Sequence, residues 1–186
     1  WNYPFQLLLA PCVAAISAGN TAVLKPSELA PTTSRVIADI IRSAFAPEYI
    51  AAVEGGAPTS NALLEQKWDY IFFTGSVAVG KIVAKAAVVH LTPVTLELGG
   101  KNPCIVDQTA QLALAAKRIV WGKFMNAGQT CIAPDYILVQ NKIKAAFVAL
   151  LKAEIEAAYG SDAENSPDFA RIINTKNFDR LQKMLD

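Results

Sequence analysis

The chain has 186 residues, of which 53% are hydrophobic and 18% are charged. This length and this apolar content fit one large domain or parts of two, with buried parallel strands. The net charge of +1 is scattered along the chain, which argues against a nucleic-acid-binding patch and against a membrane-binding face. No apolar run approaches the roughly 18 residues that are needed to cross a bilayer.

The three cysteines stand at wide, irregular spacing, which argues against a disulfide framework and favours a reducing, cytoplasmic setting. His90 is the single histidine, and no Cys-x-x-Cys or His-x-x-x-His pair is present, so the sequence predicts no metal site. The chain begins at Trp1 without a Met and ends at Asp186 inside an expected helix. We therefore expect a piece of a longer polypeptide.

Strands and helices alternate through the first half of the chain. Apolar runs that end in turn residues predict strands at residues 21–24, 50–53, 69–73 and 93–98. Longer apolar or helically spaced runs predict helices at residues 4–17, 31–45, 59–65 and 77–88. The alternation predicts βαβ units, hence an α/β fold with a Rossmann-like parallel sheet and helices on both faces. Ligands of open α/β sheets bind at the carboxyl ends of the strands, where four loops would lie, at residues 25–28, 55–56, 74–76 and 98–100.

The pattern restarts after Gly100, which predicts part of a second α/β domain. Strands are expected at residues 103–106 and 136–140, and helices at residues 110–124, 142–159 and 174–185. A short loop of small and polar residues, 126–133, carries Cys131 between a helix and a strand. We place the domain boundary between residues 98 and 99.

The turn after the third strand has Gly75, Gly80 and Lys81 at the spacing of a Walker A loop. Ile82 stands where that loop needs a Ser or Thr for Mg²⁺, so we reject an ATPase. What remains is a strand, a turn and a helix start, whose backbone N–H groups and Ser76 hydroxyl can hold a phosphate. The alternative for Ser76 is a plain helix N-cap.

Two further strand ends carry charged residues. Lys25 and Glu28 could together bind the hydroxyls of a ribose, and the alternative is a solvated surface ion pair. Glu97 ends an apolar strand before a Gly-Gly pair. Partial burial there would raise its pKa and suit it to proton transfer, whereas the alternative is an exposed strand-end glutamate.

Cys131 is the candidate nucleophile because its neighbours are poor core formers. The alternative, a buried cysteine that acts as a small hydrophobe, better suits Cys12 on an apolar helix and Cys104 in an apolar strand. His90, at a helix end, is the disfavoured candidate for a base paired with the thiol. Asn2 could donate its side-chain amide to an oxyanion.

Together and in this order, these segments resemble the NAD(P)-dependent aldehyde dehydrogenases. The matching segments are Trp1-Asn2-Tyr3-Pro4, Lys25-Pro26-Ser27-Glu28, Phe73-Thr74-Gly75-Ser76 with Gly80, Glu97-Leu98-Gly99-Gly100-Lys101 and Asn126-Ala127-Gly128-Gln129-Thr130-Cys131. The Asn-Tyr-Pro start and the Gly-Gln-Thr-Cys-Ile-Ala-Pro-Asp-Tyr run are most similar to the class 3 branch, which acts on fatty or aromatic aldehydes. The resemblance implies an NAD(P)-binding domain at residues 1–98, without its N-terminal part. It implies a catalytic domain at residues 99–186, without its C-terminal part.

The resemblance implies a mechanism for the oxidation of an aldehyde to a carboxylic acid. The Cys131 thiolate would attack the aldehyde carbon, and the Asn2 amide and the Cys131 backbone N–H would stabilise the oxyanion. Hydride transfer to NAD(P)⁺ would leave a thioester, which water activated by Glu97 would hydrolyse. The resemblance also implies a small-molecule aldehyde as the partner and a homodimer or homotetramer for the full-length protein.

The resemblance further assigns the cofactor contacts. Lys25 and Glu28 would hold the adenosine ribose, and Ser76 the pyrophosphate; the remaining cofactor-binding residues would be Gly75, Gly80 and Leu98. The carboxylate of Glu28 would repel a 2′-phosphate, which favours NAD, while Lys25 could offset this effect and admit NADP.

Three alternatives stay open beside the dehydrogenase. One is a cysteine acyl-transfer enzyme, an esterase or a CoA-acylating relative, although Glu97 argues against CoA because it would activate water. Another is a non-catalytic relative with a binding or structural role. The third is an inactive fragment, because the family's Glu-x-Phe-Gly-Pro motif, whose glutamate holds the nicotinamide ribose, has no match here. We therefore expect the 186 residues alone to have weak or absent dehydrogenase activity.

Overall fold

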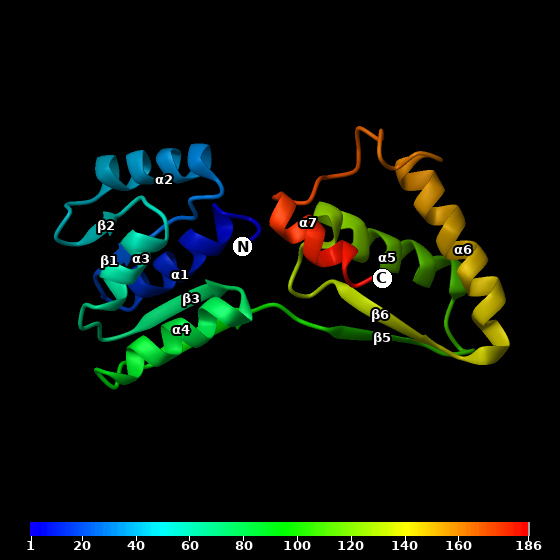
Figure 1. Cartoon of the computed structure of the whole chain (residues 1–186), viewed down its shortest axis with the longest axis horizontal. Helices are drawn as coiled ribbons and strands as arrows, with labels where there is room; N and C mark the ends of the chain where they lie inside the picture. The colour runs from blue at the N-terminus through cyan, green and yellow to red at the C-terminus, as the bar shows by residue number, and fades with distance from the viewer. Residues whose placement is uncertain (186) are drawn as a thin grey trace. The chain divides into compact units, whose positions relative to one another are not determined.

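A computed structural model describes residues 1–185 of the chain (Figure 1). The chain folds into two compact units, Trp1–Leu98 and Gly99–Asp186. Both units pair parallel strands and pack helices against them, so the α/β class predicted from the sequence is confirmed. The cofactor-binding role of the first unit and the catalytic role of the second stay predictions.

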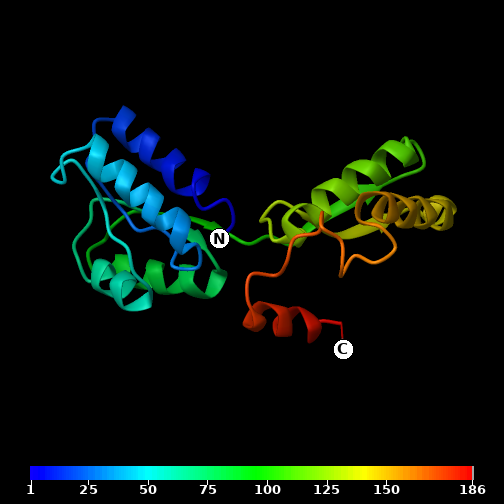
Figure 2. The same ribbon diagram turned by 90° about the horizontal axis from the view of Figure 1, so that it is seen from above.

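The first unit alternates helices and strands as the sequence predicts. Its elements are α1 (Gln6–Ser17), β1 (Ala22–Leu24), α2 (Pro31–Ala44), β2 (Ile50–Ala52), α3 (Ala57–Leu64), β3 (Ile71–Gly75), α4 (Val77–Val88) and β4 (Val94–Leu98). β1 pairs in parallel with β2, and β3 pairs in parallel with β4. Figure 2 shows α1 and α2 on one side of this unit and α3 and α4 on the other. Among the described residues, the strands hydrogen-bond in pairs rather than as one continuous sheet.

The core of the first unit follows from the helical spacing of α2. Pro31 occupies the first turn, where its fixed φ suits a helix and its missing N–H leaves no donor unpaired. Ile37 and Ile41 lie one turn apart on the buried face and pack with Cys12 of α1 and Ile50 of β2. Burying a side chain such as Ile contributes about 1.5–3 kcal/mol to stability, so this cluster holds α1 and α2 on the first strand pair.

The second unit contains one parallel strand pair and its helices within the described residues. Its elements are β5 (Asn102–Val106), α5 (Leu112–Phe124), the 3₁₀ turn η1 (Met125–Gly128), β6 (Pro134–Val139), α6 (Asn141–Tyr159) and α7 (Thr175–Gln182). β5 pairs in parallel with β6, with an irregular register between Asn102 and Pro103. Its core contains Val106, Ala116 and Phe147, from β5, α5 and α6.

Several predicted bounds shift in the structure. The strand predicted at residues 69–73 is β3, Ile71–Gly75, because Thr74 and Gly75 extend the ladder with β4 instead of forming a turn. The helix predicted at residues 174–185 is the shorter α7, which begins where the Asn174 side chain accepts a hydrogen bond from the N–H of Asn177. Among residues 1–185, no helix has both the length and the apolar character that crossing a membrane requires.

Candidate active site

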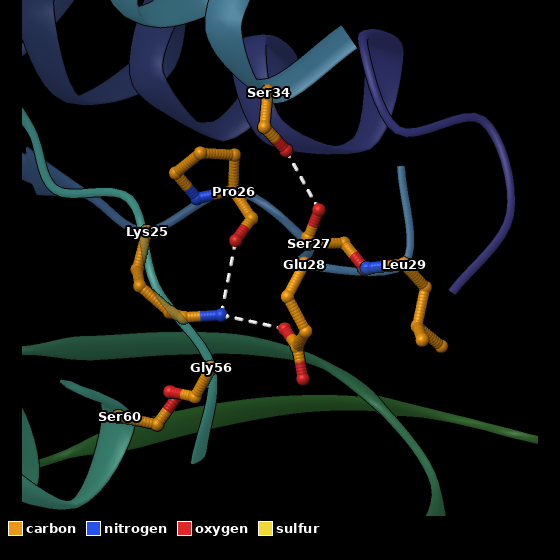
Figure 3. Close-up of polar contacts among 8 residues, drawn as sticks. All are labelled: Lys25, Pro26, Ser27, Glu28, Leu29, Ser34, Gly56 and Ser60. Carbon is orange, nitrogen blue, oxygen red and sulfur yellow. Dashed lines mark hydrogen bonds and ion pairs between the residues drawn. The ribbon is translucent and has the colours of Figure 1, made fainter. Parts of the chain in front are cut away.

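Lys25 and Glu28 meet in the loop that follows β1 (Figure 3). The Lys25 Nζ donates to Glu28 Oε2 at 2.9 Å and to the carbonyl oxygen of Pro26 at 3.0 Å. The Lys25 side chain is 19% exposed and that of Glu28 is 50% exposed. The structure therefore brings the two predicted ribose ligands together, and the carboxylate of Glu28 stays open to solvent.

Hydrogen bonds to the Ser27 carbonyl fix this loop on α2 and its N-terminus. Pro26 and Ser27 are buried, and the Ser27 carbonyl accepts a hydrogen bond from Ser34 Oγ at 2.6 Å (Figure 3). It also accepts one from the Ala30 N–H at 3.1 Å. A buried carbonyl needs a partner because leaving it unpaired costs about 1–3 kcal/mol. Ser34 lies on the buried face of α2, so its hydrogen bond fixes the position of the loop relative to this helix. Ser34 is not among the residues predicted from the sequence, although a polar residue on an otherwise apolar helix face is a signal for it.

The ion pair also sets the protonation of Glu28. The hydrogen bond from Lys25 lowers the pKa of the Glu28 carboxyl below its ordinary value, with a smaller contribution from a backbone hydrogen bond, while partial burial acts in the opposite direction. The carboxylate is therefore ionised at neutral pH. An ionised carboxylate accepts hydrogen bonds from two neighbouring hydroxyl groups, as a ribose offers.

Ser76 caps the helix that follows β3. Its Oγ accepts a hydrogen bond from the N–H of Val79 at 3.3 Å, which confirms the N-cap alternative. Ser76 is exposed, and its hydroxyl hydrogen can still be donated to an anion. The positive end of the α4 dipole lies at the same place. Phosphate binding by this turn stays a prediction beside the capping role.

Gly80 and Leu98 contact each other, and Gly75 lies opposite Leu98 in the ladder of β3 and β4. A Cβ added at Gly80 would stand 2.8 Å from Leu98 Cδ2, a distance that real Cβ atoms do not show. Gly80 is buried, so this glycine lets α4 lie close to β4. In the structure Gly80 thus has a packing role, and its contact with a cofactor stays a prediction.

Glu97 and Asn2 belong to the first unit. Glu97 is exposed, so the predicted partial burial is wrong. Alternate side chains of a strand point to opposite faces. The neighbours Leu96 and Leu98 are partly buried, and Glu97 between them points to the opposite face of β4. Asn2 is partly buried and precedes α1. Because Cys131 belongs to the second unit, the convergence of these three catalytic candidates stays a prediction.

The cysteine loop, residues 126–133, starts with an unusual backbone. Asn126 and Ala127 adopt left-handed φ values of 55° and 52°, and Gly128 follows with a φ of 76°. The left-handed conformation costs a non-glycine residue about 1–2 kcal/mol, so neighbouring contacts must hold it. Cys131 follows and is exposed, whereas Cys12 is buried and Cys104 is partly buried. The structure therefore separates the candidate nucleophile from the two cysteines that the sequence assigns to the core.

Asn102 and Gly100 contact the C-terminal half of the cysteine loop, at the carbonyls of Cys131 and Ala133. The Asn102 side-chain amide donates to the carbonyl of Cys131 at 2.7 Å and to that of Ala133 at 3.1 Å. A Cβ at Gly100 would stand 2.5 Å from the Cys131 carbonyl oxygen, so only a glycine allows this approach. Asn102 is not among the residues predicted from the sequence, because a polar residue at a strand start does not reveal a partner about thirty positions later.

The donor set fits a dinucleotide. The first unit offers an open carboxylate beside a lysine and an exposed helix N-terminus with a hydroxyl, which match a ribose and a phosphate. Among residues 1–185, no group of three or more His, Cys, Asp or Glu side chains could hold a metal ion.

The chain is similar to known proteins over its whole length. The model of the aldehyde dehydrogenase family matches residues 1–186. Mouse "Aldehyde dehydrogenase family 3 member A2" is 50% identical, over 100% of this chain and 38% of the relative. Mouse "Aldehyde dehydrogenase, dimeric NADP-preferring" is also 50% identical, over 100% of this chain and 41% of the relative. A solved structure, the substrate-bound state of Staphylococcus aureus AldH, superposes with a TM-score of 0.92 at 50% identity and covers 100% of this chain and 40% of its own.

These matches confirm the resemblance drawn from the motifs, including its class 3 character, and they agree with the Rossmann-like arrangement of the first unit. The chain spans about 40% of the length of the curated relatives that it matches. The family match extends from the first residue to the last. The chain therefore belongs to the aldehyde dehydrogenase family.

Proposed function

We propose that the polypeptide containing this chain oxidises an aldehyde to a carboxylic acid with NAD or NADP, and that Cys131 is its nucleophile. The observation that carries the proposal is the cysteine loop, which presents an exposed thiol on a backbone fixed by surrounding hydrogen bonds. Family membership supports the reaction type. The class 3 similarity favours fatty or aromatic aldehydes as substrates, and the name of one relative favours a dimer.

The chemistry assigns one task to each candidate residue. The Cys131 thiolate forms a bond to the aldehyde carbon, and the carbonyl π pair moves to the oxygen. The Asn2 side-chain amide and the Cys131 backbone N–H stabilise the oxyanion by donating hydrogen bonds. Loss of hydride from this adduct leaves the Cys131 thioester. Glu97 then takes a proton from the water molecule that attacks the thioester, and the thiolate leaves as the acid forms.

The dinucleotide, when bound, supplies the acceptor for the hydride of the aldehyde carbon. Lys25 and Glu28 hold the adenosine ribose, and the turn with Gly75, Ser76 and the start of α4 holds the pyrophosphate. The open carboxylate of Glu28 favours a ribose with a free 2′-hydroxyl, while its partner Lys25 offers a cation to a 2′-phosphate. We therefore propose that both NAD and NADP are accepted.

Steady-state formation of reduced dinucleotide tests the proposal, with a medium-chain and an aromatic aldehyde as substrates. Cys131→Ala in the full-length polypeptide should lower kcat by roughly a thousandfold or more, because no other group can form the covalent bond. Cys104→Ala is the matched control, since Cys104 is partly buried in β5 and lies against the second core. Equal activity of the Cys131→Ala variant and the wild type would refute the assignment.

A further inference from the structure

Gln129, two residues before the candidate nucleophile, uses both ends of its side-chain amide. Nε2 donates to the Asn126 carbonyl at 3.0 Å and to the Arg171 carbonyl at 3.1 Å. Oε1 accepts the backbone N–H of Ile173 at 3.0 Å. One side chain thus joins the cysteine loop to a segment that lies more than forty residues later in the sequence.

Within the loop, the Gln129 contacts fall on the left-handed turn. The Asn126 carbonyl accepts from the Gln129 backbone N–H at 3.1 Å as well as from its side chain. In return, Asn126 Nδ2 donates to the Gln129 carbonyl at 3.1 Å. These bonds close the turn around Ala127 and Gly128, and they hold the left-handed backbone of Asn126 and Ala127, which would otherwise relax towards the ordinary regions. Gln129 therefore helps to set the path of the chain as it approaches Cys131.

The partner segment is anchored independently of Gln129. The Arg171 guanidinium donates to the carbonyls of Phe169 and Glu164, which closes the segment on itself. The Phe169 ring packs against Phe124 and Tyr159, with centroid separations of 6.3 and 5.1 Å. These aromatic contacts fasten residues 164–173 to the ends of α5 and α6, so this segment gives Gln129 a fixed point to bind.

We propose that Gln129 is a positioning residue that clamps the cysteine loop to residues 171–173 and thereby fixes the backbone that presents Cys131. The inference rests on the proposed dehydrogenase for its link to turnover. The clamp acts through the loop backbone, because its bonds run to main-chain groups at Asn126, Arg171 and Ile173. It should therefore affect the chemical step more than the binding of dinucleotide, whose candidate ligands belong to the first unit.

Gln129→Met in the full-length polypeptide tests the clamp, because methionine has a similar length and makes no amide hydrogen bonds. Gln140→Met is the matched control: Gln140 also bridges two segments, accepting the Gln108 N–H at 2.8 Å, but it follows the opposite end of β6 from the cysteine loop. Amide hydrogen exchange is measured in peptides that cover residues 126–133 and 171–173. Steady-state kcat and the KM for dinucleotide are measured with a medium-chain aldehyde as the substrate.

In Gln129→Met, exchange should accelerate at least about tenfold in both segments together, and in neither segment of Gln140→Met. The kcat should fall at least about tenfold while the KM for dinucleotide stays within about twofold. Loosening of only one segment, an unchanged kcat, or the same response in Gln140→Met would overturn the inference. A wild-type protein without turnover would instead refute the dehydrogenase, and exchange alone would then decide the clamp.

Discussion

Ser34→Ala tests whether the buried Ser34 hydroxyl, which bonds to the Lys25–Glu28 loop, holds the candidate ribose site in place. Ser34 is 5% exposed, and its Oγ lies 2.6 Å from the carbonyl of Ser27, which is itself 5% exposed. Alanine removes this donor and leaves the Ala30 N–H as the remaining partner of the carbonyl. The loop then loses one of the two bonds that tie it to α2 and its N-terminus.

The magnitude follows from comparing two serines on one helix. Ser43 also lies on α2, and its Oγ donates to the Ile40 carbonyl at 2.8 Å, but Ser43 is exposed. Alanine improves helix propensity by about 0.5 kcal/mol at either site. A buried hydrogen bond contributes about 0.5–1.5 kcal/mol, whereas an exposed one is replaced by water. We expect the free energy of unfolding of Ser34→Ala to lie about 1 kcal/mol below that of Ser43→Ala.

Two measurements on the full-length polypeptide check this expectation. Equilibrium urea unfolding gives the difference in free energy between Ser34→Ala and Ser43→Ala. Titration with NAD gives their dissociation constants, and we expect binding to weaken about three- to tenfold in Ser34→Ala only, since about 1 kcal/mol corresponds to a factor near five. The reasoning is refuted if the two variants unfold at the same free energy and bind NAD equally.

Two further predictions concern the ion pair and the cysteine loop. Glu28→Gln should cost less than about 1 kcal/mol at neutral pH because the Glu28 side chain is half exposed and solvent screens the pair, and the loss should disappear in acid. The sign follows from the lowered pKa of Glu28: its contribution is full above the ordinary value of 4.5 and is lost as the pH falls through the folded-state pKa. Urea unfolding across pH measures it, and a cost that persists in acid would contradict the assignment. Asn102→Ala should lower kcat at least about tenfold by releasing two loop carbonyls, with the KM for dinucleotide unchanged, whereas Asn141→Ala, at the exposed first residue of α6, should change neither.

The sequence correctly predicts the positions of those elements that have a strong local pattern. Ile37 and Ile41 mark the buried face of α2 by their spacing, and Pro31 marks its start. The strand predicted at residues 69–73 lies two residues earlier than β3, because Thr74 and Gly75 have the composition of a turn. Their pairing with β4 overrides that composition, and pairing between strands is a tertiary effect that local propensity does not contain.

The residues of the candidate site also fall into two groups, those that a local pattern reveals and those that depend on contacts far along the chain. Lys25, Glu28, Ser76 and Cys131 stand at strand or helix ends, where a short window reveals them. The supporting contacts of Gln129 connect residues that are 42 and 44 positions apart, and no local pattern signals such a pair. The left-handed Ala127 also escapes prediction, since alanine prefers the right-handed region and only its surroundings hold it elsewhere.

The sequence separation between Gln129 and its partners in the clamp also affects how this region folds during synthesis. A ribosome synthesises a chain from its N-terminus, at about 5–20 residues each second, so Cys131 is added well before Ile173. Until Ile173 has left the ribosome, the Gln129 amide lacks the main-chain groups at Arg171 and Ile173. The nascent protein therefore carries its thiol on an unfinished loop for several seconds and completes that loop only when the later segment folds.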